Sequence, residues 1–300
     1  MEQPRDLPKR AALVVNAKSR KGRDLFFQAE EKLEERGIEL IAARAVRDPR
    51  KLRETVREVL DMGAPMVIVG GGDGTLSCAV DDFVSHDAVF AFLPLGTANS
   101  FARTVGVPLD LEGAVDVIAT GVRRRIDLGV IDSDYFANAA AIGMSPLIAE
   151  TVPHNLKRYL GRIGYLSWAA YQFLRFRPFR VTVGNEQMDA VEVRIANGRF
   201  HGGVELIESA ELDDGEIVVQ VVLGNASHRL AWSWAASILK LRARKRTVRE
   251  FHGTELRINT DPELPISIDG EVLAHTPVTA RVAKAVIEVA APREQAKSSA

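Results

Sequence analysis

The chain has 300 residues, 46% hydrophobic and 26% charged, which excludes disordered and fibrous classes and leaves room for two globular domains. Its 39 basic residues nearly balance its 40 acidic ones, so no global field would draw it to nucleic acid, and we predict no such partner. A single cysteine, Cys78, allows neither an intrachain disulfide nor a cysteine-rich zinc site, which fits a reducing compartment.

The two ends of the chain and its hydropathy indicate a location. The first ten residues, MEQPRDLPKR, are charged, carry Pro4 and Pro8 and have no apolar run after them, which argues against a signal peptide. No stretch is long and apolar enough to span a bilayer. We therefore expect a cytoplasmic protein that would meet a membrane only as a transient peripheral contact at its inner face. The tail at residues 293–300 is small and polar, and we expect it to be flexible.

Strand and helix signals alternate in the first third of the sequence. The hydrophobic pattern predicts three buried strands and two amphipathic helices, in the order strand, helix, strand, helix, strand. Asp48 and Pro49 fit the N-cap and first helical position of the second helix. The expected elements cover, in that order, residues 11–16, 23–36, 38–44, 50–62 and 65–70.

Strands that alternate with helices imply a parallel sheet with both faces covered, in which ligands bind at the carboxyl ends of the strands. We therefore expect an α/β domain over residues 8–124. Its third strand leads directly into a glycine-rich segment. That segment is thus expected at the edge of the sheet where a ligand would bind.

The sequence changes character after Gly121 and the basic cluster at residues 123–125. From there, short runs alternate apolar and polar residues, which is typical of antiparallel strands. We expect a second domain, an antiparallel β-sandwich over residues 125–292. Examples of these runs are residues 191–196, 217–222 and 255–258.

Two longer helical segments interrupt this second part, at residues 156–176 and 228–245, and both mix apolar or aromatic residues with Arg and Lys. Each either covers a sheet with its apolar face, as amphipathic helices usually do, or touches a membrane. Local basic patches would suit anionic lipid headgroups in the second case. These patches comprise Arg175, Arg177, Arg180 and residues 242–249.

The strongest chemical signal is the segment at residues 67–76, VIVGGGDGTL, in which an apolar strand ends in glycines and a helix follows. Glycines let peptide N–H groups approach an anion, and the helix start adds partial positive charge, so a phosphate chain fits there. Asp73 repels phosphate unless Mg²⁺ lies between them or the carboxylate accepts a proton from an attacking hydroxyl. Both uses are compatible with phosphoryl transfer. The alternative is a glycine turn that serves only the chain path.

Two further loops follow strands of the same predicted sheet. In NAKSRKG, polar residues and a glycine could contact a phosphate or ribose while basic residues supply charge. In LPLGTANSFAR, Thr97 and Asn99 stand at the head of a helix and could close over the same nucleotide, although Thr97 could equally be an ordinary N-cap. The candidate contacts of the first loop are Asn16, Lys18, Ser19, Arg20, Lys21 and Gly22.

Two Asp-Gly turns carry adjacent carboxylates. ELDDGE covers residues 211–216, and ISIDGE places Asp269 and Glu271 just after an apolar strand. Such turns are common between strands for structural reasons alone. Phosphoryl transfer to a hydroxyl needs a base near that hydroxyl, and Asp269 or Glu271 would serve in a cleft between domains. We interpret His201 and His252 as incidental.

Taken together, these segments resemble the diacylglycerol-kinase catalytic family, which includes bacterial lipid kinases and the sphingosine and ceramide kinases. The resemblance covers nearly the whole chain. It implies an N-terminal nucleotide-binding domain similar to that of phosphofructokinases and NAD kinases, a C-terminal β-sandwich, and ATP in the cleft between them. The matching motifs are GGGDGT at residues 70–75, GTAN at 96–99, ANGRFHGG at 196–203, LDDG at 212–215 and DGE at 269–271.

The resemblance also implies roles for individual residues. The glycine loop with Asp73 and Thr75 would hold the ATP phosphates and Mg²⁺, and Asp269 or Glu271 would deprotonate the lipid hydroxyl. The implied ATP-binding set is Asn16, Ala17, Lys18, Ser19, Arg20, Gly70, Gly71, Gly72, Asp73, Gly74, Thr75 and Thr97.

In bacterial members of this family, the turn that corresponds to Glu211, Asp214 and Glu216 holds a structural Mg²⁺, partly through backbone carbonyls. The chain departs from the common bacterial pattern at Ser100, where an aspartate often follows the asparagine, and at residues 204–209, where VELIES replaces a stretch richer in proline and alanine. The first departure would alter the network around Mg²⁺. The second would alter the acceptor pocket.

The resulting hypothesis is an ATP- and Mg²⁺-dependent lipid kinase of phospholipid metabolism that transfers the γ-phosphoryl group to a lipid hydroxyl, with diacylglycerol the first substrate to test. One alternative is an NAD-kinase-like enzyme with a soluble substrate, disfavoured because no Asn-Glu pair follows the glycine loop. Another is a non-catalytic nucleotide or lipid sensor, disfavoured because Asp73, Asp269 and Glu271 are all present. The acceptor lipid and the oligomeric state, a homodimer included, stay open.

Overall fold

The structure, a computed structural model, describes residues 5–18, 20–144, 146, 171–172, 176–225 and 247–293. Its N-terminal part is built on four parallel strands in the order β2, β1, β3, β4. Every residue of β3 and β4 is buried, and because successive side chains point to opposite faces, both faces of the sheet are covered. The strands are β1 (Arg10–Asn16), β2 (Glu39–Val46), β3 (Met66–Gly71) and β4 (Val89–Pro94).

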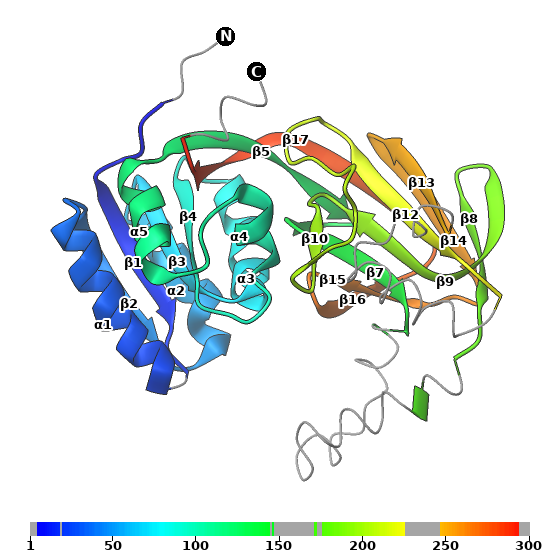
Figure 1. The fold of residues 1–300 in the computed structure, drawn as a ribbon, viewed down its shortest axis with the longest axis horizontal. Helices are drawn as coiled ribbons and strands as arrows, with labels where there is room; N and C mark the ends of the chain where they lie inside the picture. Colours follow the sequence, from blue (N-terminus) through cyan, green and yellow to red (C-terminus); the bar gives the residue numbers. More distant parts are fainter. Residues whose placement is uncertain are drawn as a thin grey trace.

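Two groups of helices cover this sheet (Figure 1). α1 packs with α5, and α2 packs with α3. In α2, Leu52, Val56, Val59 and Leu60 are buried, a helical spacing that turns one apolar face to the sheet. The helices are α1 (Arg20–Glu35), the 3₁₀ turn η1 (Pro49–Lys51), α2 (Leu52–Asp61), α3 (Asp73–Val84), α4 (Ser100–Val105) and α5 (Leu111–Thr120).

All five elements expected in the first third are present, with limits within three residues of those predicted. Asp48 is an N-cap, as predicted, because its side chain accepts a hydrogen bond from the Arg50 N–H at 3.1 Å. The element that it caps differs from the prediction. Pro49 opens the short 3₁₀ turn η1, and α-helical geometry starts only at Leu52.

The C-terminal part is an antiparallel β-sandwich, as predicted. Its strands pair in the order β16, β15, β7, β9, β8, β14, β17, and β12 joins β9 to β13. Alternate residues such as Ile142, Val193 and Ile266 point into a hydrophobic core. The strands after the first sheet are β5 (Val122–Ile131), β6 (Asp134–Phe136), β7 (Ala139–Gly143), β8 (Phe179–Val183), β9 (Glu186–Ala196), β10 (Phe200–His201), β11 (Val204–Glu205), β12 (Ile217–Leu223), β13 (Val248–Gly253), β14 (Glu255–Asp261), β15 (Pro265–Ile268), β16 (Glu271–His275) and β17 (Val278–Ala291).

Two long strands, β5 and β17, connect the two parts of the molecule (Figure 1). They pair antiparallel with each other, and the end of β17 also pairs parallel with β4, where Val289 lies opposite Phe90. The last strand of the chain therefore returns to the first sheet. Along the way β17 is kinked by a bulge at which Ala285 has a φ of 51°. The domain limits at residues 8–124, 125–292 and 293–300 stay a prediction.

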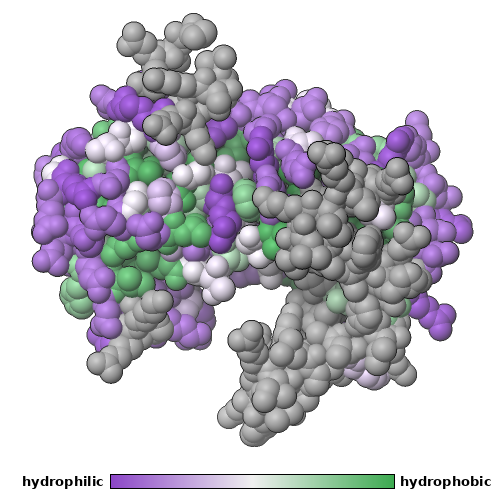
Figure 2. Space-filling model, viewed as in Figure 1, coloured by the Kyte–Doolittle hydropathy of each residue, from purple (hydrophilic) through white to green (hydrophobic). Residues whose placement is uncertain are grey.

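Several predictions concern residues outside the described ranges, namely most of the helices at 156–176 and 228–245, residue 175, residues 242–246 and the tail from residue 294. Of the described basic residues, Arg249 forms an ion pair with Glu186 at 3.0 Å, and Arg180 lies 3.9 Å from Asp189. In the described part of the chain, no helix is long and apolar enough to cross a membrane. On the face in Figure 2, hydrophilic side chains dominate the rim, with apolar ones nearer the middle.

Candidate active site

The glycine loop joins β3 to α3, as the sequence predicts. Gly72 is the N-cap of α3, and the Thr75 N–H donates to the Gly72 carbonyl at 2.9 Å. Gly96 of the second loop lies so close to this backbone that a Cβ on Gly96 would stand 2.5 Å from the Gly72 Cα. Glycine is required at this contact because no side chain fits between the two loops. The prediction that the loops lie together is confirmed.

A pocket of about 460 Å³ opens beside the glycine loop. Asn16, at the end of β1, donates from Nδ2 to the Thr75 Oγ1 at 3.2 Å, which ties the first loop to the glycine loop. Lys18 is exposed and supplies positive charge. Glycine backbone, a helix start and an ammonium group together suit a phosphate chain. The described lining residues are Asn16, Lys18, Gly22, Leu25, Gly71, Gly72 and Leu95.

The other residues predicted to contact the nucleotide do not line this pocket in the described part of the chain. Ala17 is buried, and so is Gly70 within β3. Gly74 is exposed in the first turn of α3, and Thr97 is exposed on the second loop and is not among the described lining residues of the pocket. The remaining members of the set, Ser19 and the side chain of Arg20, lie outside the described part of the chain.

Asn99 organises the second loop, a role that sequence reasoning did not assign to it. It has a φ of 48°, in the left-handed region that asparagine tolerates better than most residues. Its Oδ1 accepts from the Gly96 N–H at 3.0 Å, and its Nδ2 donates to the Pro94 carbonyl at 3.3 Å. α4 begins directly after it, so the alternative interpretation of Thr97 as an N-cap is wrong.

Asp73 and Asp269, predicted from motifs in different parts of the sequence, are both held by residues that contact α4 or its neighbours. The Asp73 Oδ1 accepts from the Phe101 N–H at 3.3 Å, which joins the glycine loop to α4. Asp269 lies in the turn between β15 and β16, and after burial, the negative charge of Asp73 contributes to raising the pKa of Asp269. Ala137, whose N–H donates to Asp269, and Thr104 of α4 both lie beside Gly198, where a Cβ would stand 3.1 Å from the Thr104 Oγ1 and 3.6 Å from the Ala137 carbonyl oxygen. The DGE turn and the glycine loop are therefore connected through α4.

Three backbone groups hold the Asp269 carboxylate. Its Oδ2 accepts from the Ala137 N–H at 3.1 Å, and its Oδ1 accepts from the N–H groups of Asn138 at 3.3 Å and Ala139 at 3.1 Å. Burial is the main reason that the pKa of Asp269 is raised to about 6, and the three hydrogen bonds act in the opposite direction. With a φ of 44°, Asp269 also sets the path of the turn.

Glu271 differs from Asp269 in its surroundings. It is the first residue of β16 and is exposed. Within the described part of the chain, its carboxylate forms no hydrogen bond and no ion pair. Burial, and then the negative charge of Glu271, raise the pKa of Cys78 on α3. The exposed Glu271 carboxylate therefore has lone pairs available to a ligand.

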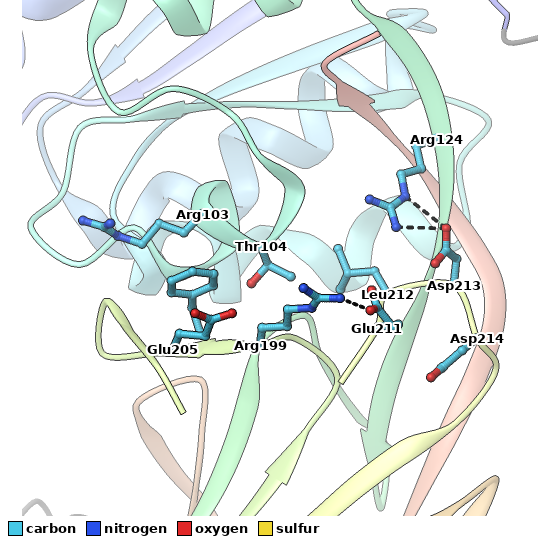
Figure 3. A pocket seen from close by; sticks show the side chains of 10 residues that line it. Arg103, Thr104, Arg124, Arg199, Glu205, Glu211, Leu212, Asp213 and Asp214 are labelled. Atoms are coloured by element: carbon cyan, nitrogen blue, oxygen red, sulfur yellow. Dashed lines mark hydrogen bonds and ion pairs between the residues drawn. The ribbon is translucent and has the colours of Figure 1, made fainter. Parts of the chain in front are cut away.

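The turn at residues 211–216 borders a second, polar pocket of about 630 Å³ (Figure 3). Glu211 forms an ion pair with Arg199. Asp213 accepts two hydrogen bonds from Arg124, at 2.9 and 3.1 Å. The described lining residues are Arg103, Thr104, Arg124, Arg199, Phe200, Glu205, Glu211, Leu212, Asp213 and Asp214.

The carboxylates of this turn do not by themselves form a metal cage. Among the described residues, no three His, Cys, Asp or Glu side chains come together closely enough to hold a metal ion. The Asp214 Oδ1 accepts from the Glu216 N–H at 3.0 Å. Burial, and then the negative charges of Glu216 and Asp127, raise the pKa of Asp214. A cation would relieve that repulsion, and it fits here only if Asp214 holds it together with backbone carbonyl oxygens.

Asp127, which sequence reasoning missed, holds the turn at residues 211–216 in place through a hydrogen bond. It is buried in β5, where its Oδ2 accepts from the Gly215 N–H at 2.7 Å and its Oδ1 accepts from the Ala285 N–H at 2.6 Å. It thus ties the turn to the bulge of β17. The available signal was a carboxylate inside the apolar second half of β5, IDLGVI, because a buried charge needs partners.

Comparison with known proteins agrees with this geometry. The model of the diacylglycerol kinase catalytic domain matches residues 10–131, and that of the YegS C-terminal NAD kinase beta sandwich-like domain matches residues 138–291. The second match alone covers more than half of the chain.

Curated relatives and a solved structure are similar over most of the chain. The protein named probable lipid kinase YegS-like from Enterobacter sp. (strain 638) is 31% identical over 219 residues, which cover 70% of this chain and 73% of that protein. A protein of the same name from Pseudomonas fluorescens is 32% identical over 237 residues, 74% of this chain and 77% of that one. The crystal structure of a diacylglycerol kinase from Bacillus anthracis shares the fold, with a TM-score of 0.72 at 20% identity over 94% of this chain and 97% of that one. The chain therefore belongs to the diacylglycerol kinase catalytic-domain family, among its YegS-like members.

Proposed function

We propose that this protein is an ATP- and Mg²⁺-dependent lipid kinase that transfers the γ-phosphoryl group of ATP to a lipid hydroxyl, with diacylglycerol the first acceptor to test. The observation that carries the proposal is the link between Asp73, in the glycine loop, and Asp269, in the DGE motif. Phe101 of α4 donates its N–H to Asp73, while Thr104 of the same helix lies against Gly198, next to the Ala137 that donates its N–H to Asp269. A phosphate site and a carboxylate base within reach of each other are what phosphoryl transfer to a hydroxyl requires. The names of its curated relatives support a lipid acceptor.

The pocket beside the glycine loop is the proposed place for the ATP phosphates. N–H groups at the start of α3 and the glycine backbone would donate to phosphate oxygens, and Lys18 would balance their charge. Because the Thr75 Oγ1 accepts a hydrogen bond from Asn16, its own O–H remains available to donate to a phosphate. The full proposed contact set is the one that the family resemblance implies.

We assign the role of base to Glu271 and a positioning role to Asp269. Asp269 is committed to three backbone N–H groups, which hold the turn in shape. Glu271 follows two residues later, exposed, and can accept the proton of an acceptor hydroxyl. Replacement of Asp269 would therefore lower the rate of phosphoryl transfer by displacing Glu271.

Two sites for Mg²⁺ belong to the proposal. Asp73 would hold the ion that accompanies the nucleotide. Its Oδ1 accepts from the Phe101 N–H, and its Oδ2 has no hydrogen-bond partner among the described residues. Such an ion would offset negative charge on the phosphoryl oxygens. Asp214, with the carbonyl oxygens of Glu211 and Glu216, would hold a structural ion at the second pocket.

The lipid acceptor places the enzyme at a membrane surface. We propose a cytoplasmic protein that binds the inner face of the membrane peripherally, through the basic patches at Arg175, Arg177, Arg180 and residues 242–249. Their arginines would contact anionic headgroups, and the contact would weaken as salt screens it.

The test is transfer of labelled γ-phosphate from Mg²⁺-ATP into mixed micelles that contain candidate lipids, followed by extraction. Label in the organic phase supports the proposal and names the acceptor. Label confined to an aqueous product such as phosphorylated NAD would instead indicate a soluble acceptor. ATP binding without transfer to any lipid would indicate a sensor.

A further inference from the structure

The pocket of about 630 Å³ beside the turn at residues 211–216 has the volume of a site for a small organic molecule. Its walls come from both parts of the chain, because Arg103 and Thr104 belong to α4 whereas Arg199 and Phe200 lie where the β10–β11 hairpin of the β-sandwich begins (Figure 3). Its described lining residues include none of those that line the pocket beside the glycine loop. It is therefore distinct from the proposed site of the ATP phosphates.

Two arginine–carboxylate pairs form part of this wall. The Arg124 Nε and Nη2 both donate to the Asp213 Oδ2, so the Arg124 Nη1 and the Asp213 Oδ1 have no hydrogen-bond partner among the described residues. Arg199 donates from Nε to the Ala210 carbonyl at 3.3 Å and from Nη2 to the Glu211 Oε1, which leaves its Nη1 and the Glu211 Oε2 without a described partner. Each pair thus fixes the orientation of one donor and one acceptor that stay available to a ligand.

The charges that line the pocket nearly cancel. Its described lining residues include three arginines and four acidic residues, a formal charge of −1. With the Mg²⁺ proposed at Asp214 the charge would be +1. In neither case does a strong field of one sign attract a free anion or a free cation. A hydroxyl group suits such a wall, because it donates to a carboxylate and accepts from a guanidinium at the same time.

The rest of the wall suits the carbon skeleton of a hydroxyl-rich ligand. Phe200 contributes an aromatic ring, whose negatively polarised face attracts C–H groups. Thr104 donates its hydroxyl proton to the Ser100 carbonyl at 3.0 Å, so the lone pairs of its oxygen can accept a further hydrogen bond. Both polar and apolar sides of a sugar-like ring therefore find partners.

We propose that this pocket binds a neutral polyhydroxylated group, such as a sugar or an inositol ring. The group is either a free polyol or the headgroup of a lipid, which share the chemistry that the pocket recognises. Because Phe101 of α4 donates its N–H to Asp73, a ligand held against Thr104 would stabilise the helix that supports the proposed phosphate site. The inference goes beyond the proposed kinase function and is tested by binding alone.

The experiment titrates the full chain, without nucleotide or lipid, with myo-inositol and with glucose in a calorimeter. It compares the wild type with Arg199→Gln and with the control Arg281→Gln, whose arginine pairs with Glu255 at 2.9 Å and does not line the pocket. We expect saturable binding of at least one probe to the wild type, with a Kd of about 1 mM. Arg199→Gln should weaken it at least about 10-fold, because the ligand loses a hydrogen bond to a charged group, and Arg281→Gln should leave it unchanged.

Phe200→Leu provides a second test should Arg199→Gln fail to fold. It keeps an apolar side chain but removes the ring, and we expect it to weaken binding about 3-fold to 10-fold. In the wild type the bound probe should also raise the midpoint of thermal unfolding, since only the folded chain has the pocket.

Sedimentation with phosphatidylcholine vesicles, with and without a glycosyl diacylglycerol, distinguishes the two sources. Binding to the glycosylated vesicles alone, lost in Arg199→Gln, would assign the pocket to a lipid headgroup, whereas binding of the free probes alone would assign it to a soluble polyol. Three results would overturn the inference: no binding of either probe or of glycosylated vesicles, binding that Arg199→Gln and Phe200→Leu leave unchanged, or displacement of the probe by inorganic phosphate. None of them bears on the kinase proposal, which is read from label in the lipid.

Discussion

Replacing Asp269 by Asn should remove a pH dependence of stability that burial of this carboxyl imposes. The pKa of Asp269 is raised from 3.8 to about 6 in the folded state. Between these two values the folded protein holds the proton while the unfolded chain has released it. As the pH rises through this window the free energy of unfolding of the wild type therefore falls, since the folded state binds more protons. Below pH 4 the effect vanishes.

The magnitude follows from the size of the shift. About two pKa units correspond to about 3 kcal/mol, and this is an upper bound because the side chain keeps some contact with water. The assay is urea unfolding of the wild type and Asp269→Asn at pH 4, 5, 6 and 7. All other titrating groups are common to both proteins, so the difference between the two free energies isolates this carboxyl.

From pH 4 to pH 7 we expect the wild type to lose stability relative to the variant, by up to about 3 kcal/mol. A pH-independent difference in the free energy of unfolding between the two proteins is consistent with this prediction, because asparagine cannot accept all three backbone hydrogen bonds. A difference that stays level with pH, or that moves in favour of the wild type as pH rises, would refute the reasoning.

Three further predictions concern the loops, the metal and the membrane. Gly96→Ala should weaken ATP binding at least about 10-fold in calorimetry, because its Cβ would force the two loops apart, whereas Gly253→Ala in β13, whose Cβ would come no closer than 3.5 Å to another atom, should bind normally. Adding Mg²⁺ without nucleotide should raise the unfolding temperature, an effect lost in Asp214→Asn and kept in Asp213→Asn, whose carboxylate pairs with Arg124. Sedimentation with anionic vesicles should decrease as salt rises, and salt-independent binding would remove the basic patches from the account.

The parallel sheet and the glycine loop could be predicted from sequence because local composition determines them. Short apolar runs predict buried strands. The run of glycines predicts a loop with closely packed backbone, and the structure has such a contact between Gly72 and Gly96, where no side chain fits. Asp48 was likewise recognisable as a cap because its partner is two residues away. The family motifs extended this local reasoning to the DGE turn.

Features that depend on distant partners could not be predicted. The alternation in β17 indicates a strand but not that its end pairs with β4. The three N–H groups that hold Asp269 belong to residues more than a hundred positions earlier in the sequence. The sequence around the DGE motif therefore indicates neither the raised pKa of Asp269 nor which of Asp269 and Glu271 is the base.

The most direct test of the central claim is lipid phosphorylation by Glu271→Gln beside the wild type, with ATP binding measured on both. Glutamine keeps the size of the side chain but cannot accept the proton, so we expect label in the lipid to fall by about 10²-fold to 10⁴-fold while ATP affinity is unchanged. Near-normal transfer by Glu271→Gln would contradict the assignment of the base. Absence of transfer by the wild type to every lipid tested would contradict the kinase itself.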